Sequence, residues 1–327
     1  MHASDKTLDV AYARIALAVG LWFCTAFSDF AFQAQTQPTL NSPSSKSSLT
    51  PQVKNVFWQP NELRPGSPAF FTVELNRVPA RVSGTWIDKK LTFFKSENPK
   101  IWYALAGADL ATQPGSDDLH VAAVLTNGKR LTFVKTVELT AANFRTGELE
   151  VPEKFVEPNA TEQEQIARDQ ALKKRAFERV TARPLWSGDF IKPVNGPAET
   201  ESFGEERILN EERTTTHLGT EFEVKKGTPV LVSNSGTVVL AKEMFYEGNC
   251  VIVDHGQRFF TIYMHLSKID VKVGARLRKG QQIGLSGASG RATGPHLHMG
   301  VRWNGAYLDP AQLLTLTLPK TGSQRTR

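Results

Sequence analysis

Cysteine is scarce in this sequence, with Cys24 and Cys250 the only two among 327 residues. Cys24 lies in an apolar segment near the amino terminus that we expect to act in export, so Cys250 would be alone in the processed chain and no internal disulfide could form there. Cys250 belongs to the apolar run 249–253 and is interpreted as a small buried hydrophobic residue. The chain also lacks a run of Lys and Arg interleaved with aromatic residues, so it gives no support for a nucleic-acid partner.

Long apolar runs are also rare. Residues 15–28, IALAVGLWFCTAFS, fall short of the roughly 20 apolar residues that a membrane-spanning helix needs. They follow a few charged residues and precede Ala34, a small residue suited to a cleavage site, so we interpret residues 1–34 as a signal peptide or an anchor. This predicts a protein that is exported, either periplasmic or associated with the cell envelope, and that contacts the membrane only through this segment.

The rest of the chain has the composition of a soluble globular protein and is long enough for two domains. Residues 35–52 are rich in Ser, Thr, Pro and Gln and are predicted to be a disordered linker. Between residues 53 and 144, short runs of alternating apolar residues are separated by turn signals such as Arg64-Pro-Gly66 and Asn127-Gly128. About seven strands in this span predict a small Ig-like antiparallel sandwich.

Residues 145–197 are predicted to connect this sandwich to a second domain. Thr161-x-x-Glu164 offers a capping box for a helix at about 161–180, and its thin apolar stripe of Ile166, Leu172 and Phe177 favours a solvated connector. Residues 198–316 return to a β pattern, with strands expected near 230–232, 236–241, 250–254 and 259–265, and residues 317–327 are expected to be a disordered tail. The predicted fold class is therefore mainly β, with antiparallel sheets and one linking helix.

Four histidines lie in three short motifs of the second β region: His217-Leu-Gly-Thr-Glu221, Tyr263-Met-His265-Leu-Ser and Gly-Pro-His296-Leu-His298. Residues i and i+2 of a strand point to the same face at a spacing of roughly 6–7 Å, so one histidine of a His-x-His pair can bind a metal ion while the other works beside it. His217 and Glu221 cannot share an ion on a straight strand, because four residues rise about 13 Å, but Gly219 between them can take a positive φ and allow a bend. Two histidines and a carboxylate would leave the fourth position of zinc open to water, as in catalytic sites.

No His-Glu-x-x-His motif is present, which excludes a thermolysin-like zinc protease. The chain instead resembles the LytM/lysostaphin-type zinc metallopeptidases, which cut peptide cross-links in bacterial peptidoglycan. The resemblance extends over residues 200–312 and rests on the histidine motifs together with Ser202-Phe-Gly204, Gly236-Thr-Val238, Val253-Asp-His-Gly256, Gly290-Arg-Ala-Thr-Gly-Pro-His-Leu-His298 and Leu308-Asp-Pro310. The upstream sandwich, with the segment 149–156, also resembles the amino-terminal domain of a two-domain subgroup of this family.

The resemblance implies one Zn²⁺ per chain, held by His217, Glu221 and His298, in a peptidase domain built on a duplicated-hybrid-motif-like antiparallel sheet. The family has aspartate where this chain has Glu221; glutamate keeps the charge and the oxygen donor, but its extra methylene moves the oxygen by about a bond length. His265 and His296 match the family's two histidines that do not bind the metal. One is expected to act as the base and the other to stabilise the oxyanion, and the sequence leaves the assignment open.

The expected partners are the stem or cross-bridge peptides of peptidoglycan, together with a protein regulator of the cell-wall machinery. An alternative function of a different class is a catalytically inactive LytM-type module that binds peptidoglycan or activates another wall hydrolase. A zinc-stabilised structural domain is disfavoured, because structural zinc takes four protein ligands. The other residues considered are His120, His255 and Asp309, which are interpreted as structural, and Asn249 and Tyr263, which fit a groove lining and a core or turn position equally well.

Overall fold

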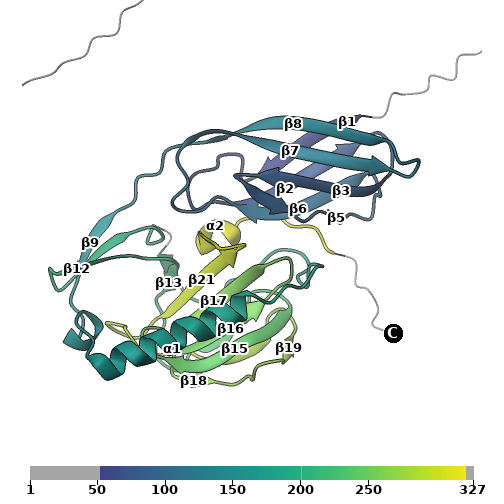
Figure 1. Ribbon diagram of the computed structural model, residues 1–327. Coiled ribbons are helices and arrows are strands. Elements are labelled where there is room, and N and C mark those ends of the chain that lie inside the picture. Colours follow the sequence, from purple (N-terminus) through teal and green to yellow (C-terminus); the bar gives the residue numbers. More distant parts are fainter. Residues whose placement is uncertain (1–51, 200, 322–327) are drawn as a thin grey trace, which may run out of the picture. The chain divides into compact units, whose positions relative to one another are not determined.

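The structure is a computed structural model that describes residues 52–199 and 201–321 (Figure 1). The expected signal or anchor segment, residues 1–34, lies outside these residues, and so does the predicted linker apart from residue 52. Within the described ranges, no helix is long and apolar enough to cross a membrane.

The first part of the described chain consists of antiparallel sheets that pack face to face. One has the strand order β1 (Val53–Gln59), β2 (Pro68–Leu75), β6 (Ile101–Gly107) and β5 (Phe94–Lys95). The other has the order β4 (Lys89–Leu91), β3 (Pro79–Trp86), β7 (Gly115–Leu125) and β8 (Arg130–Leu139). Phe71 on β2 and Trp86 on β3 are both buried, and their rings meet edge to face with 5.0 Å between centroids. The sheets are thus joined by the apolar faces that their alternating sequences create.

A small sheet follows, in which β9 (Thr146–Leu149) pairs in parallel with β11 (Glu206–Leu209), and β11 pairs in antiparallel fashion with β12 (Arg213–Thr216). Between β9 and β11 lie the 3₁₀ helix η1 (Glu153–Phe155) and the helix α1 (Ala160–Phe177). The capping box of α1 is formed by Asn159 and Glu162, not by Thr161 and Glu164 as predicted. The Asn159 side chain accepts from the Glu162 N–H at 3.0 Å, and the Glu162 carboxylate accepts from the Asn159 N–H at 2.8 Å, because Asn159 has the extended backbone of an N-cap.

Helix α1 packs against the large sheet and is not a solvated connector. Leu172, Ala176 and Phe177 belong to an apolar cluster with residues of that sheet, and the rings of Phe177 and Phe260 lie 5.3 Å apart. Polar contacts add to this thin stripe, since the buried Asp169 carboxylate accepts from the Phe245 N–H at 2.8 Å. The prediction from the sequence missed this packing because it considered only the apolar residues of the helix.

The large sheet carries most of the second domain. Its strand order is β10 (Ala198–Glu199), β13 (Thr220–Phe222), β21 (Leu297–Trp303), β17 (Phe259–Leu266), β16 (Gly248–Asp254), β15 (Gly236–Met244) and β19 (Arg276–Leu277), with β22 (Ala306–Leu308) paired to β21. Alternate residues of β16 serve different cores: Cys250 and Ile252 face the cluster under α1, whereas Val251 and Val253 join the main core. The central strands are therefore buried on both faces, and Cys250 is a buried hydrophobic residue as predicted.

A further sheet has the order β14 (Pro229–Leu231), β20 (Gln282–Leu285) and β18 (Lys268–Ile269), and α2 (Pro310–Leu313) closes the domain. Asp309 caps α2 by accepting from the Ala311 N–H at 2.8 Å, which agrees with the structural role expected for it. The segment 317–321 does not match the expected disordered tail, because Leu318 is buried with Trp186 and its N–H donates to Asp189 at 2.7 Å. The predicted mainly β fold with antiparallel sheets is confirmed.

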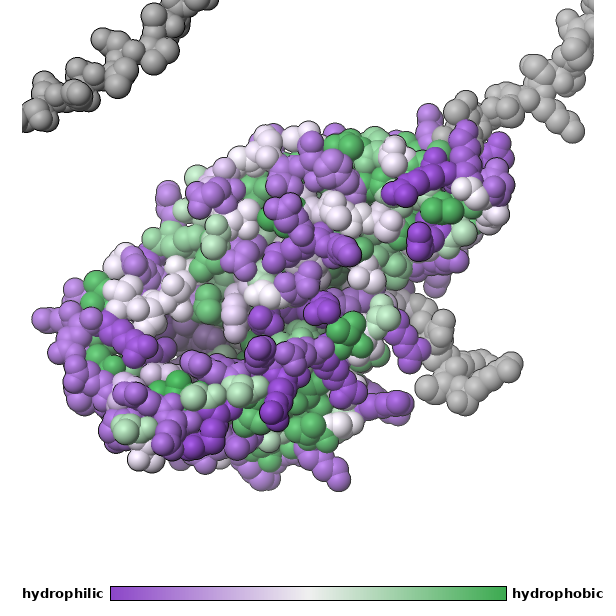
Figure 2. Space-filling model, viewed as in Figure 1, coloured by the Kyte–Doolittle hydropathy of each residue, from purple (hydrophilic) through white to green (hydrophobic). Residues whose placement is uncertain are grey.

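The face of the molecule shown in Figure 2 is hydrophilic over most of its area, with apolar residues interspersed. The exposed large apolar side chains of the described residues come from separate elements, for example Phe57, Val134 and Val273. Single exposed apolar residues of this kind are ordinary and do not indicate a binding face. The features that point to a function lie in a cleft beside the large sheet.

Candidate metal centre and catalytic cleft

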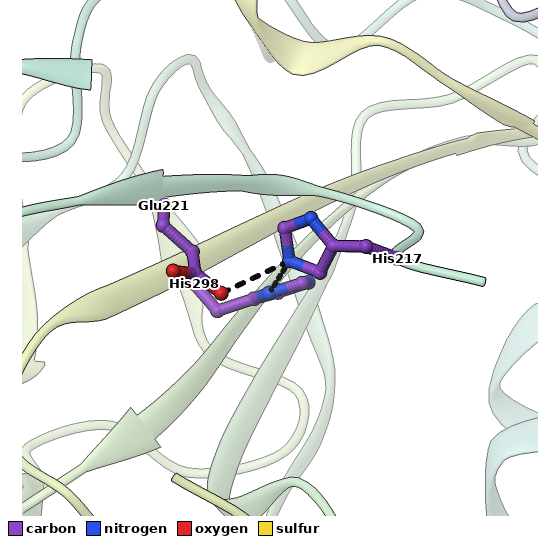
Figure 3. Close-up of side chains that lie close together, drawn as sticks. All are labelled: His217, Glu221 and His298. Atoms are coloured by element: carbon purple, nitrogen blue, oxygen red, sulfur yellow. Dashed lines mark hydrogen bonds and ion pairs between the residues drawn. The ribbon is translucent and has the colours of Figure 1, made fainter. Parts of the chain in front are cut away.

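Three side chains from different backbone segments meet beside the large sheet (Figure 3). Glu221 on β13 and His298 on β21 are direct partners in the antiparallel register of these two strands. His217 follows the last residue of β12 and enters from the loop that leads into β13. Cross-strand partners have Cβ atoms about 4.5–5.5 Å apart, so the sheet itself brings Glu221 and His298 together, while the loop supplies His217.

The donor atoms of these three residues converge. The Nε2 atom of His217 lies 3.0 Å from Nδ1 of His298 and 3.2 Å from Oε1 of Glu221, and one donor atom from each residue falls within 4.8 Å of the other two. Zinc–nitrogen bonds of about 2.0–2.1 Å place the ligand atoms of a tetrahedral site about 3.3 Å apart. The observed spacing and the donor types therefore fit a zinc ion.

The backbone sets the orientation of His217. Its Nδ1 lies 2.7 Å from the carbonyl oxygen of Ser202, and only an N–H at Nδ1 makes this a hydrogen bond. The lone pair of Nε2 is then left for a metal ion, as is usual for histidine ligands whose other nitrogen donates to a carbonyl. His298 is also neutral, because burial in the first place, and then the charges of His217 and His265, hold its pKa well below its usual range.

Glu221 is ionised and braced by arginine. Burial alone would raise its pKa, but the hydrogen bond with His217 and the positive charge of Arg207 outweigh burial and lower the pKa. Arg207 Nη1 donates to Glu221 Oε1 at 2.8 Å, while its Nε donates to Glu205 at 2.6 Å. Arg207 therefore fixes the orientation of the longer glutamate, while Glu205 is shared between Arg207 and the more exposed Arg145, whose Nη2 lies 3.4 Å from it.

Gly219 allows the loop to approach His298. A Cβ atom at this position would lie 2.3 Å from His298 Nε2 and 2.5 Å from the carbonyl oxygen of Met299. Gly219 could have allowed a bend through a positive φ, but it is not among the positive-φ glycines of the described residues. The glycine is therefore required for close approach to the strand and not for a left-handed bend.

A second pair of histidines lies beside the first. The rings of His265 and His296 are 4.9 Å apart between centroids, and the ring of His265 is 5.9 Å from that of His298. The Nδ1 atoms of both point to backbone oxygens, that of His265 to Ser289 at 2.8 Å and that of His296 to Gly294 at 2.9 Å. Burial, and then the charge of His296, lowers the pKa of His265 to about 4, so His265 is neutral at pH 7.

The backbone of His265 is unusual. Adjacent residues of a regular strand point to opposite faces, yet both Met264 and His265 on β17 line the cleft. His265 has a φ of +59°, a left-handed conformation that costs a non-glycine residue about 1–3 kcal/mol. This break in the alternation turns the imidazole toward the other histidines. Alternation alone explains the positions of His296 and His298, which are two residues apart and both line the cleft.

The cleft around these residues has a volume of about 430 Å³. Its walls come from β9 and β11 on one side and from the turns at 246–247 and 291–293 on the other, and it also receives Lys173 from α1. Charged side chains are numerous in these walls: Glu148, Lys173, Glu205, Arg207, Glu221, Glu247 and Arg291. A cleft of this polarity suits an extended polar chain better than an apolar ligand.

The structure separates the remaining candidates. His255 is buried, with Nδ1 2.8 Å from the Ser235 oxygen and Nε2 2.7 Å from the Thr261 hydroxyl, and His120 is exposed on β7, outside the cleft. Tyr263 is buried within the core, and the Asn249 amide donates to the Leu266 oxygen, so neither lines the cleft. The sequence analysis did not identify Arg207 and Lys173 as residues of the cleft, because a single sequence does not show which distant residues they contact.

Comparison with known proteins places this geometry in context. Residues 215–310 match the model of peptidase family M23. A crystal structure of a protein assigned to peptidase M23 from Pseudomonas aeruginosa aligns with a TM-score of 0.58 and 30% sequence identity, over 77% of this chain and 95% of that one. The four histidines and Glu221 lie within residues 215–310, whereas Glu148, Lys173 and Arg207 of the cleft precede that match.

Two curated relatives are similar to part of this chain. The peptidoglycan DD-endopeptidase ShyA of Vibrio cholerae is 51% identical over 86 residues, which are 26% of this chain and 20% of that protein. The DD-carboxypeptidase/endopeptidase Mpg of Neisseria meningitidis is 36% identical over 97 residues, which are 30% of this chain and 22% of that protein. The match thus spans about a fifth of the length of these curated relatives.

Proposed function

The chain belongs to peptidase family M23, and from that premise we propose that it is a zinc-dependent endopeptidase that hydrolyses peptide cross-links of bacterial peptidoglycan. The observation that carries this proposal is the convergence of two imidazole nitrogens and a carboxylate oxygen in a cleft that also contains a second histidine pair. The substrate class is suggested by the names of relatives such as ShyA.

In the proposed site, His217, Glu221 and His298 hold the ion. Two imidazoles and one carboxylate are three of the four ligands of a catalytic zinc site, and the distances of His217 Nε2 to the other two donors suit a tetrahedral ion. A zinc ion held there would supply a Lewis acid that polarises the scissile carbonyl and activates a water molecule for attack. Arg207 keeps Glu221 in place by donating to its Oε1, and Glu205 in turn accepts from the Nε of Arg207.

The second histidine pair moves the protons in this proposal. Hydrolysis adds a water oxygen to the carbonyl carbon and breaks the C–N bond, and the leaving nitrogen gains a proton. His265 is neutral and its Nδ1–H is bonded to the Ser289 oxygen, so its Nε2 carries a lone pair that can accept the proton of the attacking water. This geometry supports His265 as the base, which can then pass the proton to the leaving nitrogen. For His296 to stabilise the developing oxyanion, its Nε2 would also have to carry a hydrogen, because its Nδ1 is already bonded to the Gly294 oxygen.

The proposal includes export, because an enzyme acting on peptidoglycan must reach the cell envelope. Residues 1–34 would carry the chain there as a signal peptide or an anchor, which gives a periplasmic or envelope-associated protein. We also propose that its contact with the membrane is confined to that segment and that a protein of the cell-wall machinery regulates it.

The direct test is digestion of purified peptidoglycan sacculi with the zinc-loaded chain, followed by identification of the released muropeptides by mass spectrometry. The wild type should release cross-link cleavage products, and both a chelator and His298→Ala should abolish the release. The matched control is His120→Ala, which replaces an exposed histidine outside the cleft and should leave the release unchanged. Intact sacculi after treatment with zinc-loaded wild type would contradict the proposal.

A second candidate function, an inactive module that binds peptidoglycan or activates another hydrolase, has one observation in its favour. The oxygen of Glu221 that faces His217 is also the oxygen that accepts from Arg207. If Arg207 held Glu221 away from the ion, the chain would bind sacculi without cutting them. Co-sedimentation with sacculi in the absence of released muropeptides would support this function.

A further inference from the structure

The charged side chains of the cleft are mostly paired. Among the described residues, Arg207 bonds to Glu205 and Glu221, and Lys173 pairs with Glu247. Arg291 and Glu148, which also line the cleft, have no oppositely charged side chain of the described residues within 4.0 Å. Glu148 is exposed to solvent, whereas Arg291 is partly buried. Arg291 is therefore a cation that lies inside the cleft and lacks a carboxylate partner there.

The guanidinium of Arg291 lies over an aromatic ring. Its central carbon is 4.9 Å from the centroid of the Tyr246 ring, and the backbone N–H of Arg291 donates to the backbone carbonyl oxygen of Tyr246 at 2.9 Å. A cation over a ring is attracted to its π face, and the N–H groups of the guanidinium can still donate to a ligand. An arginine fixed in this way is prepared to bind a planar anion with two hydrogen bonds.

The backbone around Arg291 is rigid and shared with the histidine pair. Ser289, two residues earlier, accepts from His265 at 2.8 Å, and His296 follows five residues later. Gly290 packs so closely on the neighbouring turn that a Cβ atom there would lie 2.3 Å from the Gly248 nitrogen. The position of Arg291 is therefore fixed relative to His265 and His296.

Arg291 keeps its positive charge in the cleft. Its pKa is lowered chiefly by burial, with Tyr246 acting in the opposite direction and Arg213 adding to the decrease. Arg291, His265 and His296 line the same cleft. An arginine remains charged under these conditions, so an anionic ligand would gain a strong interaction at this point.

We propose that Arg291 is a specificity-determining residue that binds a carboxylate of the substrate peptide, carried by the residue that supplies the leaving amine. This inference rests on the proposed function. In the proposed reaction the leaving amine takes its proton on the side of the histidine pair, so the residue that departs lies beside Arg291. The cleft then prefers peptides with a free carboxylate next to the scissile amide over the same peptides with a carboxamide.

The test compares two synthetic peptides that differ only in a free carboxylate or a carboxamide on the residue after the scissile amide. With the zinc-loaded wild type, kcat/KM for the carboxylate peptide should exceed that for the carboxamide by about tenfold to a hundredfold, the range of a charge-assisted hydrogen bond. Arg291→Gln should bring the ratio close to one by slowing only the carboxylate peptide. Arg291→Lys should keep part of the preference, because it keeps the charge but loses the planar fork.

Glu148→Gln is the matched control, because it changes the cleft charge by one unit in the opposite direction without touching the Arg291 guanidinium. It should alter the ratio by less than about threefold, a change expected of a solvent-screened charge. A wild type that does not distinguish the peptides, or an Arg291→Gln variant that keeps the preference, overturns the inference. If Glu148→Gln raised the ratio by the same factor by which Arg291→Gln lowered it, the peptides would sense only the net charge of the cleft, and the inference would be overturned as well.

A binding measurement distinguishes failure of this inference from failure of the proposed function. Fluorescence anisotropy of the two labelled peptides, measured with the full chain carrying His296→Ala to slow turnover, should show the same preference for the carboxylate and its loss when Arg291→Gln is added. If neither peptide is cut but the binding preference depends on Arg291, the proposed function fails and the carboxylate site stands. If both peptides are cut equally and bound equally, the carboxylate site fails and the proposed function stands.

Discussion

Alanine at position 219 should disrupt the proposed zinc site without a change in any ligand residue. The added Cβ atom would lie 2.3 Å from Nε2 and 2.6 Å from Cε1 of His298, and 2.5 Å from the Met299 oxygen. Nonbonded carbon contacts are relaxed at about 3.5 Å or more, so the atoms must separate by about 1 Å. The Met299 oxygen belongs to the backbone of β21, which leaves the His298 ring or the loop with His217 to move.

A shift of this size is large for a metal site, where ligand distances are held within about 0.2 Å. We therefore expect Gly219→Ala to weaken zinc binding at least about tenfold to a hundredfold and to lower hydrolysis by about a hundredfold. The overpacking should also reduce the free energy of unfolding of the zinc-free chain by about 1–3 kcal/mol. Zinc affinity is measured by competition with a chromophoric chelator, and stability by urea unfolding.

Gly294→Ala is the matched control. Gly294 also lies beside a site histidine, since its oxygen is 2.9 Å from His296 Nδ1, but a Cβ atom there would meet no atom within 4 Å and its φ is not positive. This variant should bind zinc like the wild type. If Gly219→Ala bound zinc with wild-type affinity, or if both variants lost it equally, the close approach of the loop to His298 would not be what forms the site.

Three further variants test other parts of the site and the core. Glu221→Gln removes the charge of the carboxylate ligand and should weaken zinc binding about a hundredfold or more. Glu205→Gln only loosens Arg207, so its zinc affinity should stay within about tenfold of the wild type. Equal effects of the two variants in the chelator competition would argue against Glu221 as a ligand. His265→Ala should lower kcat by about 10²–10⁴-fold while the zinc content measured by atomic absorption stays at one per chain; loss of zinc together with activity would make His265 a ligand and not the base. Burial lowers the pKa of His255 to about 4, below its value of about 6.5 in the unfolded chain, so the unfolded chain takes up the proton first as the pH falls. Stability is therefore full above about pH 6.5 and declines toward pH 4, with a loss from His255 of about 2 kcal/mol at pH 5. Urea unfolding at pH 7 and pH 5 should show a smaller loss in His255→Gln than in wild type, and identical losses would exclude this role of His255.

The parts of the site that the sequence could predict are those that depend on local geometry. His296, which immediately precedes β21, and His298 on that strand are two residues apart and both line the cleft, and this spacing is visible in the sequence. The bend between His217 and Glu221 follows from the rise of a strand, although the role of Gly219 turned out to be close approach to His298 and not positive φ. The mainly β fold follows from the alternating patterns of the strands.

The parts that could not be predicted depend on contacts between distant segments. Arg207 reaches Glu221 from another sheet, and β9 joins that sheet by a parallel pairing across 57 or more residues of chain. Helix α1 packs through buried polar residues such as Asp169, which an apolar pattern does not count. The left-handed backbone of His265 is imposed by its surroundings, since no residue preference favours it.

The central claim is that His217, Glu221 and His298 hold one zinc ion, and anomalous scattering at the zinc edge from crystals of the zinc-loaded chain tests it most directly. We predict a single peak about 2.0–2.2 Å from His217 Nε2, His298 Nδ1 and a Glu221 oxygen, with a fourth position open toward His265 and His296. A vacant site under saturating zinc, or an ion bound by the histidines while Glu221 stays on Arg207 alone, would contradict the claim.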